Sequence, residues 1–284
     1  MQVHEENNFF NILKRHRIQL IVTVLLVCGL YYSVIPPMVR QWYEDPNYSH
    51  GFIVPFIAAY FLYKKYDTLK KVSVSPNNSG LSVIIFSLLM LTIANLGTEY
   101  FTLRASLIFL LAGLVLYLFG KEVFKLTLLP LFYLFFMVPL PYIVYDSIAF
   151  PLKLFVAKYS VLTLQEIGID VWREGNIIIF SDTMLEVADA CSGIRSLMSL
   201  LALGVAYAFV SHTSNIKKLV IILSAIPLSI FANGLRVIVT GILTQYWGVR
   251  AAHGFFHEFS GLSVFGLAFG LLLLLGVIIK KIGR

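Results

Sequence analysis

The stretch Val187-Ala188-Asp189-Ala190-Cys191-Ser192-Gly193-Ile194-Arg195-Ser196-Leu197 lies where a polar part of the chain meets an apolar one. Upstream of it, short runs of β-branched and aromatic residues alternate with turn residues, and downstream of it an apolar run begins. A cysteine at the beginning of a helix lies near free backbone N–H groups and the positive end of the helix dipole, which favour the thiolate. Arg195 follows Cys191 by four residues, so it shares a helix face and adds a favourable positive charge. The stretch therefore predicts a nucleophilic Cys191 at a strand-to-helix transition.

The composition of the whole chain is that of a membrane protein. Of 284 residues, 58% are hydrophobic and 13% are charged, whereas a soluble domain carries about 25% charged residues. Too few polar residues are present to coat a soluble globule, so we predict a polytopic membrane protein that is surrounded by the lipid bilayer. The net charge of +7 is explained by Lys and Arg at the ends of membrane segments, and no nucleic-acid partner is expected.

Eight apolar runs predict the membrane spans, each of which needs about 20 residues. They are residues 18–36, 51–66, 80–96, 104–119, 123–141, 193–210, 217–245 and 260–279. We expect one domain over residues 1–284, with five N-terminal spans in 18–141, an outer segment in 142–190 and three catalytic spans in 191–284. The expected fold class is an all-α polytopic membrane protein with about eight transmembrane helices.

The segment 142–166 is predicted to lie on the membrane surface rather than to cross it. Asp146, Lys153, Lys158 and Glu166 recur among its apolar residues, and charges at this frequency are costly in the bilayer centre. An amphipathic interfacial helix fits this pattern. With eight spans, most of the 22 basic residues fall on the side of both termini, as on a cytoplasmic face. We therefore expect a location in the cell (inner, cytoplasmic) membrane.

Between residues 167 and 190 the pattern changes to short strands. The run Val171–Phe180 contains the turn Glu174-Gly175-Asn176, and Thr183–Val187 forms another β-rich run. Val, Ile and Phe near turn residues favour a β meander. We expect this extracytoplasmic sheet to deliver the chain to Cys191.

Ionisable residues occur near the predicted outer ends of the last spans. Arg236 lies inside an apolar run. A charge there indicates either a functional site or a side chain that snorkels to the interface. Asn233 precedes Arg236 by three residues and is a candidate to orient it. His257 lies directly before the last span, and His253 precedes it by four residues, so both share a helix face. His50, in the first outer loop, is a candidate either to approach the same site or to cap that loop.

A cysteine, a histidine and an arginine on one side of the membrane form a set that can transfer an acyl group. Cys191 would attack a peptide carbonyl, Arg236 would stabilise the oxyanion or position the substrate, and His257 would act as general acid and base. Whether Arg195 or Arg236 contacts the oxyanion is open. This chemistry requires no cofactor and no metal.

Three motifs resemble those of the exosortase and archaeosortase family of membrane cysteine transpeptidases. The cysteine motif is Ala190-Cys191-Ser192-Gly193-Ile194-Arg195-Ser196, the arginine motif is Asn233-Gly234-Leu235-Arg236, and the histidine motif is His257-Glu258-Phe259-Ser260-Gly261. The first loop, Asp45-Pro46-Asn47-Tyr48-Ser49-His50-Gly51, also resembles a segment of that family. The motifs occur in order over most of the chain, which resembles a core-only form of the family.

The resemblance implies a membrane enzyme that sorts exported proteins. Family substrates end in a C-terminal tail made of a short motif such as Pro-Glu-Pro, one transmembrane helix and a basic cluster. The resemblance implies cleavage through a thioester on Cys191, with Arg236 and His257 as partners, and transfer to an acceptor that it does not identify.

Two other classes of function are open at this point. Zinc accepts Cys and His ligands, and a set made of Cys191, His253 and His257, with His50 as an additional candidate ligand, would suit a metal-dependent hydrolase. A polytopic transporter would use Arg236 and the polar break at Asn233-Gly234 in a substrate path, although no inverted repeat is visible.

Overall fold

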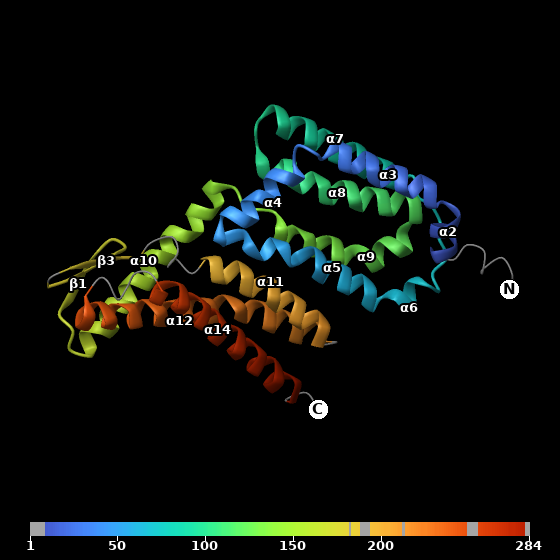
Figure 1. Cartoon of the computed structure of the whole chain (residues 1–284). Coiled ribbons are helices and arrows are strands. Elements are labelled where there is room, and N and C mark those ends of the chain that lie inside the picture. The colour runs from blue at the N-terminus through green and yellow to red at the C-terminus, as the bar shows by residue number, and fades with distance from the viewer. Residues whose placement is uncertain (1–8, 182, 188–193, 212–213, 249–254, 282–284) are drawn as a thin grey trace. The chain divides into compact units, whose positions relative to one another are not determined.

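The computed structural model describes residues 9–181, 183–187, 194–211, 214–248 and 255–281, and leaves out the side chains of Phe10 and of residues 255–259. The chain forms two compact units, which we call unit 1 (Met1–Pro141) and unit 2 (Tyr142–Arg284). Figure 1 follows the chain from unit 1 in blue and green to unit 2 in yellow and red.

Unit 1 consists of helices joined by short connections. They are α2 (Phe9–Arg15), α3 (Arg17–Leu30), α4 (Ile35–Glu44), η1 (Pro46–Phe52), α5 (Val54–Lys64), α6 (Tyr66–Leu69), α7 (Ser79–Leu96), α8 (Tyr100–Phe119), α9 (Lys121–Tyr133) and η2 (Leu134–Met137), where η marks a 3-10 helix.

Helices α7 and α8 pack together at two glycines. A Cβ atom on Gly80 would lie 2.3 Å from the backbone nitrogen of Tyr117, and one on Gly113 would lie 2.9 Å from that of Ile84. Small residues allow helix backbones to approach this closely in membranes, where van der Waals packing drives association. These two glycines therefore set the distance between α7 and α8.

Trp42 near the end of α4 joins that helix to η1 and to η2. The indole nitrogen of Trp42 donates a hydrogen bond to the carbonyl oxygen of Met137 (2.8 Å). Gly51 lies against the same indole, because a Cβ there would approach Trp42 Nε1 to 2.6 Å. The end of α4, η1 and η2 therefore meet at the buried indole of Trp42.

Unit 2 combines long helices with one small sheet. Its elements are α10 (Tyr142–Glu166), β1 (Val171–Glu174), β2 (Ile177–Phe180), β3 (Met184–Glu186), α11 (Ile194–Ser211), α12 (Asn215–Trp247) and α14 (Phe255–Lys281).

The helix α10 differs from the expected interfacial helix. It is one continuous helix of 25 residues, long and apolar enough to cross a membrane. Its buried side includes Tyr145, Val156 and Leu164, yet large apolar side chains such as Ile143 and Phe155 are exposed on its other sides. The charged residues are therefore spread around an apolar helix and do not form the polar face of an amphipathic one.

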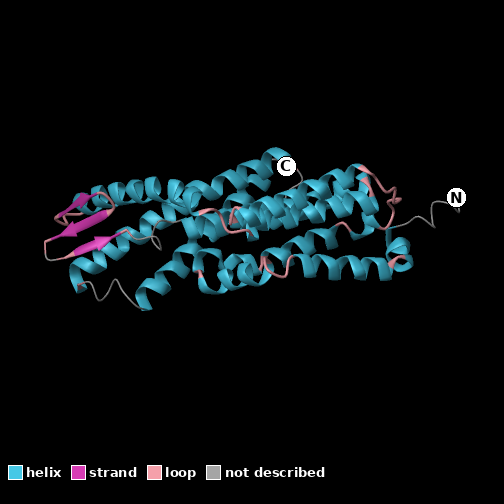
Figure 2. Cartoon of the chain, turned by 90° about the horizontal axis from the view of Figure 1, so that it is seen from above, coloured by secondary structure: helices cyan, strands magenta, loops and turns pink. Residues whose placement is uncertain are grey.

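The predicted β meander is confirmed. The three strands pair antiparallel in the order β1-β2-β3, with Val171 opposite Phe180 and Ile177 opposite Glu186. Gly175 in the first turn has φ +60, a conformation that glycine adopts without strain. Strands β1 and β2 pack against α10, which is labelled beside them in Figure 1, and Figure 2 shows the three strands together. The strands share with α10 and α12 a buried core of Leu164, Ile178, Phe180, Val187 and Val237, among others.

Helices α11, α12 and α14 share a second buried core in unit 2. Leu200, Ile221, Ala225, Ala268 and Leu272 are fully buried in it. The many alanines in this core keep the three helices close together, as expected for helices that associate in lipid.

Six helices of the described residues are long and apolar enough to cross a membrane: α7, α8, α10, α11, α12 and α14. Helices α3 and α4, which are bent by 64° relative to each other, would form a seventh span if they cross together. The predicted spans 51–66 and 123–141 appear as the shorter helices α5 (11 residues) and α9 (13 residues). The helix count is therefore close to the expected eight, and the fold class is confirmed: the chain is an α-helical, multi-pass membrane protein with one small sheet.

Candidate active site

A line of polar residues follows one face of α12. Ser229 and Asn233 are 1% and 2% exposed, and Arg236 is half-buried. The spacing i, i+4, i+7 puts the three residues on one side of the helix. We call these three residues the polar seam. Buried polar side chains are stable only with hydrogen-bond partners, so the seam depends on the helices that pack against it.

The polar seam connects α12 to both neighbouring helices. At one end, the hydroxyl of Ser229 is hydrogen-bonded to that of Ser196 on α11 (3.2 Å). At the other end, Arg236 Nε donates to the hydroxyl of Ser260 on α14 (3.1 Å). The beginning of α11, the middle of α12 and the beginning of α14 therefore meet along this line.

The guanidinium of Arg236 lies against the backbone of α14. A Cβ atom on Gly261 would be 3.4 Å from Arg236 Nη2, so the glycine leaves just enough room for the guanidinium. Position 257 precedes Ser260 by three residues and Gly261 by four, so the three positions lie on one face of α14. The arginine motif thus reaches the helix that carries the histidine motif.

The segment that contains Cys191, residues 188–193, lies outside the described residues, but the chain is anchored on both sides of it. Before it, Val187 is 1% exposed, its N–H donates to Asn176 O (2.9 Å) and its carbonyl accepts from Asn176 Nδ2 (3.2 Å). After it, Ile194 is buried against Tyr145 and Ala149 of α10. The sheet and α10 therefore fix where this segment begins and ends.

The two candidate arginines lie in different surroundings. Arg195 is the second residue of α11, is exposed, and forms no hydrogen bond or ion pair with any other residue that the structure describes. Arg236 is half-buried and bonded to Ser260. A guanidinium that is held in place and partly desolvated is the better preorganised donor for an oxyanion.

His50 belongs to unit 1 and is bound into its loop. Its Nε2 is hydrogen-bonded to the carbonyl oxygen of Phe136 (3.1 Å). Burial lowers the pKa of His50, and its hydrogen bonds to the carbonyls of Phe136 and Asn47 oppose that shift only in part. Because a carbonyl oxygen can only accept, Nε2 donates this hydrogen bond and ties the loop of His50 to η2.

The candidate metal site falls largely on residues that the structure leaves out. Cys191 and His253 lie outside the described residues, and the side chain of His257 is not described. Elsewhere in the described chain, no group of three His, Cys, Asp or Glu side chains is close enough to hold a metal ion.

Three serines of this site were not singled out by the sequence reasoning: Ser196, Ser229 and Ser260. A usable signal was present for Ser229, because it precedes Asn233 by four residues and Arg236 by seven on an otherwise apolar helix. In the sequence, Ser260 is distinguished only by its place in the histidine motif, and Ser196 only by its place in the cysteine motif. Their pairing with α12 depends on how the helices pack, which no local pattern encodes.

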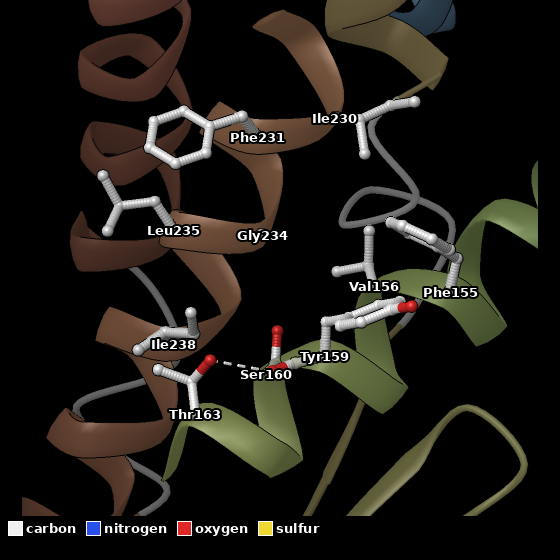
Figure 3. Close-up of a pocket in the computed structure, with 10 residues that line it drawn as sticks. All are labelled: Phe155, Val156, Tyr159, Ser160, Thr163, Ile230, Phe231, Gly234, Leu235 and Ile238. Atoms are coloured by element: carbon white, nitrogen blue, oxygen red, sulfur yellow. Dashed lines mark hydrogen bonds between the residues drawn. The ribbon is translucent and has the colours of Figure 1, made fainter. Parts of the chain in front are cut away.

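A separate groove lies between α10 and α12. It has a volume of about 250 Å³ and is lined mainly by apolar side chains, among them Phe155, Tyr159, Phe231 and Leu235, with Gly234 at its α12 side (Figure 3). Gly234 and Arg236 are two residues apart in the helix, so their positions lie on nearly opposite sides of α12. The groove is therefore not part of the polar seam.

A comparison with models of protein families identifies the family to which this chain belongs. The sequence matches the transmembrane exosortase family over residues 42–274, which is most of the chain and includes residues of both units. Comparisons with curated proteins and with solved structures gave no match. Because the family match covers far more than half of the chain, the protein belongs to the transmembrane exosortase family.

Proposed function

We propose that this protein is a membrane-embedded cysteine peptidase and transpeptidase that cleaves the C-terminal sorting tails of exported proteins through a thioester on Cys191. Membership of the exosortase family supports a sorting or transpeptidase role in the membrane. The observation that carries the proposal furthest is the hydrogen bond from Arg236 to Ser260, because it joins the arginine motif to the helix of the histidine motif.

The anchoring of the chain around Cys191 supports its role as the nucleophile. Only Ser192 and Gly193 separate it in sequence from Ile194, which is buried at the start of α11. Two residues after Ile194, Ser196 is bonded to the polar seam. The described part of the cysteine motif, Ile194 to Ser196, is therefore the end of α11 that meets α12.

The proposed reaction proceeds in two steps. First, the Cys191 thiolate attacks the carbonyl carbon of the scissile peptide, and Arg236 balances the charge of the tetrahedral oxyanion. The C–N bond then breaks, and protonated His257 donates a proton to the leaving amine. Next, neutral His257 takes a proton from water or from an acceptor nucleophile, which attacks the thioester, and the C–S bond breaks to regenerate the thiolate.

The proposed substrates follow from the family. They are exported proteins whose tail consists of a short motif, one transmembrane helix and a basic cluster, so that the scissile bond lies at the extracytoplasmic surface of the bilayer. We place the active site on that side of the membrane and both termini in the cytoplasm, because in an arrangement of eight spans in which α10 does not cross, most basic residues fall on the side of the termini.

Co-expression with a tagged, tail-bearing reporter from the same organism tests the proposal. We expect the wild type to shorten the reporter, and Cys191→Ala to leave it at full length while the variant reaches the membrane in normal amounts. Cys28→Ser is the matched control, because Cys28 is the exposed cysteine of α3 in unit 1 and its loss should leave processing intact. A thiol reagent should label Cys191 and block processing together.

Other outcomes would contradict this function. Processing that survives Cys191→Ala excludes the thioester. Processing that is lost in a chelator and restored by zinc supports a metal-dependent hydrolase. Solute uptake that does not depend on Cys191, without reporter cleavage, supports a transporter.

A further inference from the structure

Unit 1 carries a group of exposed basic side chains that have no ion-pair partner among the residues the structure describes. They are Lys14, Arg15, Lys70, Lys71 and Lys121, and we call them the basic surface. The two ion pairs within the described chain are formed elsewhere, by Arg40 with Glu44 and by Lys125 with Glu122. None of the side chains of the basic surface donates a hydrogen bond to another described residue. Their charges are therefore available to a ligand.

The basic surface is assembled from three separate segments that pack on one apolar cluster. The cluster includes Ile12 of α2, Val72 in the segment after α6, and Val123 of α9. The rings of Phe9 on α2 and Phe119 on α8 lie 5.0 Å apart in it. Each basic residue lies within three positions of Ile12, Val72 or Val123 in the sequence, and Figure 1 shows α2 and α6 at the same end of unit 1. The fold thus gathers cations that are far apart in the chain.

This end of unit 1 is also where two membrane helices end. Helix α7 begins at Ser79 and α8 ends at Phe119, and both are long and apolar enough to cross a membrane. The two ends lie side by side, since a Cβ on Gly80 would be 2.3 Å from the backbone nitrogen of Tyr117. Lys121 follows α8 by two residues. The basic surface therefore lies where apolar helices leave the hydrocarbon core, at the level of the lipid headgroups.

The acidic residues of these segments do not neutralise the basic surface. Glu122 accepts a hydrogen bond from Lys125 (2.8 Å), and Asp67 of α6 is exposed and forms no ion pair with a described residue. Glu5 and Glu6 precede α2 in the sequence and lie outside the described residues. Like charges that are brought together repel each other. An anion that binds among these cations therefore stabilises the packing of the three segments.

The topology of the chain does not by itself require this convergence. Basic residues orient a membrane protein through the side on which they lie, whether or not they come together. Clusters of Lys and Arg next to membrane helices attract the headgroups of anionic lipids. Phosphate oxygens accept charge-assisted hydrogen bonds from ammonium and guanidinium groups. A cluster that combines these cations with the ends of membrane helices thus fits a phosphate that is attached to acyl chains.

We propose that the basic surface binds the headgroups of anionic phospholipids in the leaflet that it meets. The phosphate lies among the Lys and Arg side chains, and the acyl chains lie along α7 and α8, where Leu81 and Tyr117 are exposed near the same helix ends. The bound lipid reduces the repulsion between the three segments and holds α2 on unit 1. This inference concerns unit 1 alone and does not depend on the proposed reaction.

Fluorescence quenching at the basic surface tests the inference. In the full chain, with Cys28 and Cys191 replaced by Ser, a fluorophore is attached to Ser73→Cys, an exposed position between Lys71 and the buried Val74. Nanodiscs of phosphatidylcholine contain a quencher-labelled lipid, either phosphatidylglycerol or phosphatidylcholine. We expect phosphatidylglycerol to be preferred about fivefold or more, the effect of one cation near an anionic headgroup. The preference should decrease at about 1 M salt, which screens the charges.

Charge variants show which residues produce the preference. Lys71→Gln combined with Lys121→Gln should bring it close to one, whereas Lys71→Arg combined with Lys121→Arg should keep it. The matched control is Lys217→Gln combined with Lys218→Gln, which removes two charges from α12 in unit 2 and should leave the preference unchanged. Because the ratio compares two lipids on one protein, a variant that folds in smaller amounts does not alter it.

Other outcomes overturn the inference. If both lipids quench the unaltered surface equally, or if the control variant loses the preference as well, the basic surface is not a site for anionic headgroups. If a preference arises only when Glu5→Gln and Glu6→Gln are combined, acidic residues of the chain itself occupy the surface. Release of the lipid by free glycerol phosphate would identify a soluble phosphate as the ligand, and release by an RNA fragment would identify a nucleic acid.

Discussion

At the residue scale, Arg236 combines the energetic cost of a charge in an apolar helix with its proposed role at the oxyanion. Its guanidinium lies in an apolar helix, and its hydrogen bond to Ser260 and the space at Gly261 hold it against α14. A charge that is fixed in this way needs little reorganisation when an oxyanion forms beside it. The snorkelling alternative does not require this contact, which makes Ser260 a useful position to test.

We expect Ser260→Ala to lower the processing rate about three- to tenfold, because a hydrogen bond worth roughly 0.5–1.5 kcal/mol is lost. Ser260→Thr keeps the hydroxyl and should restore most of the rate. Ser263→Ala is the matched control, since Ser263 is exposed one turn further along α14. In an Arg236→Ala background, Ser260→Ala should have no further effect. An additional loss there would mean that Ser260 acts independently of the arginine.

His50 makes the stability of the protein depend on pH. Burial lowers the pKa of His50 in the folded protein, so below about pH 6.5, the ordinary histidine value, the unfolded chain binds more protons than the folded one. The free energy of unfolding therefore decreases as the pH falls through this range. We expect the melting temperature in detergent to drop between pH 7 and pH 5.5, and to drop less in His50→Asn.

The control for His50 is His16→Asn, because His16 is exposed at the start of α3. This variant should keep the pH dependence of the wild type. If both variants have the same pH dependence, another group is responsible for it.

At the scale of elements, close helix packing is set by a few glycines. Gly80 brings α7 against the backbone of Tyr117 in α8, and Gly276 of α14 faces Tyr207 of α11, whose ring would be 2.3 Å from a Cβ at that position. In lipid, the hydrophobic effect does not drive helices together, because the lipid tails are as apolar as the helix surfaces. Helix association therefore depends on close van der Waals contacts of this kind.

Gly80→Ala should destabilise unit 1 by about 1–3 kcal/mol, the typical cost of overpacking, because the added methyl meets backbone atoms that cannot rotate away. The melting temperature in detergent measures this effect. Gly29→Ala in α3 is the control, since nothing lies within 4 Å of its Cβ position, and it should leave the melting temperature unchanged or slightly higher. Equal melting temperatures for the two variants would show that the α7–α8 distance can adjust.

At the scale of the whole molecule, the side of the membrane that each segment faces follows from the distribution of charge. We expect the small sheet to face outside and the connection after α6 to face the cytoplasm. The length of α10, which is sufficient for a span, makes this arrangement important to test.

Labelling of single cysteines tests the topology. In a chain with Cys28 and Cys191 replaced by Ser, a membrane-impermeant maleimide should label Glu174→Cys, an exposed position of β1, on intact cells. It should label Lys70→Cys, exposed after α6, only after the cells are permeabilised. The reverse pattern would place the sheet in the cytoplasm and contradict the proposed location of the active site.

Local patterns were sufficient for much of the fold. Apolar runs predicted most of the long helices, and the turn at Glu174-Gly175-Asn176 predicted the β1–β2 hairpin with its correct turn. Both patterns arise from interactions within a few residues of each other. For 142–166, the number of charged residues suggested an amphipathic helix. In the structure these residues are spread around α10, and large apolar side chains are exposed between them, so the helix has no single polar face.

The sequence by itself determined that this is a polytopic membrane protein of the exosortase family, and it located the three motifs on which the proposed chemistry depends. Only the tertiary structure decided which residues meet. Arg236 finds Ser260 24 positions away, Ser196 finds Ser229 33 positions away, and Arg104 finds Gln41 63 positions away. Contacts of this kind form when helices pack at particular distances and rotations, which depend on the shapes of both partners together. The periodicity of one segment contains no information about the segment that it meets.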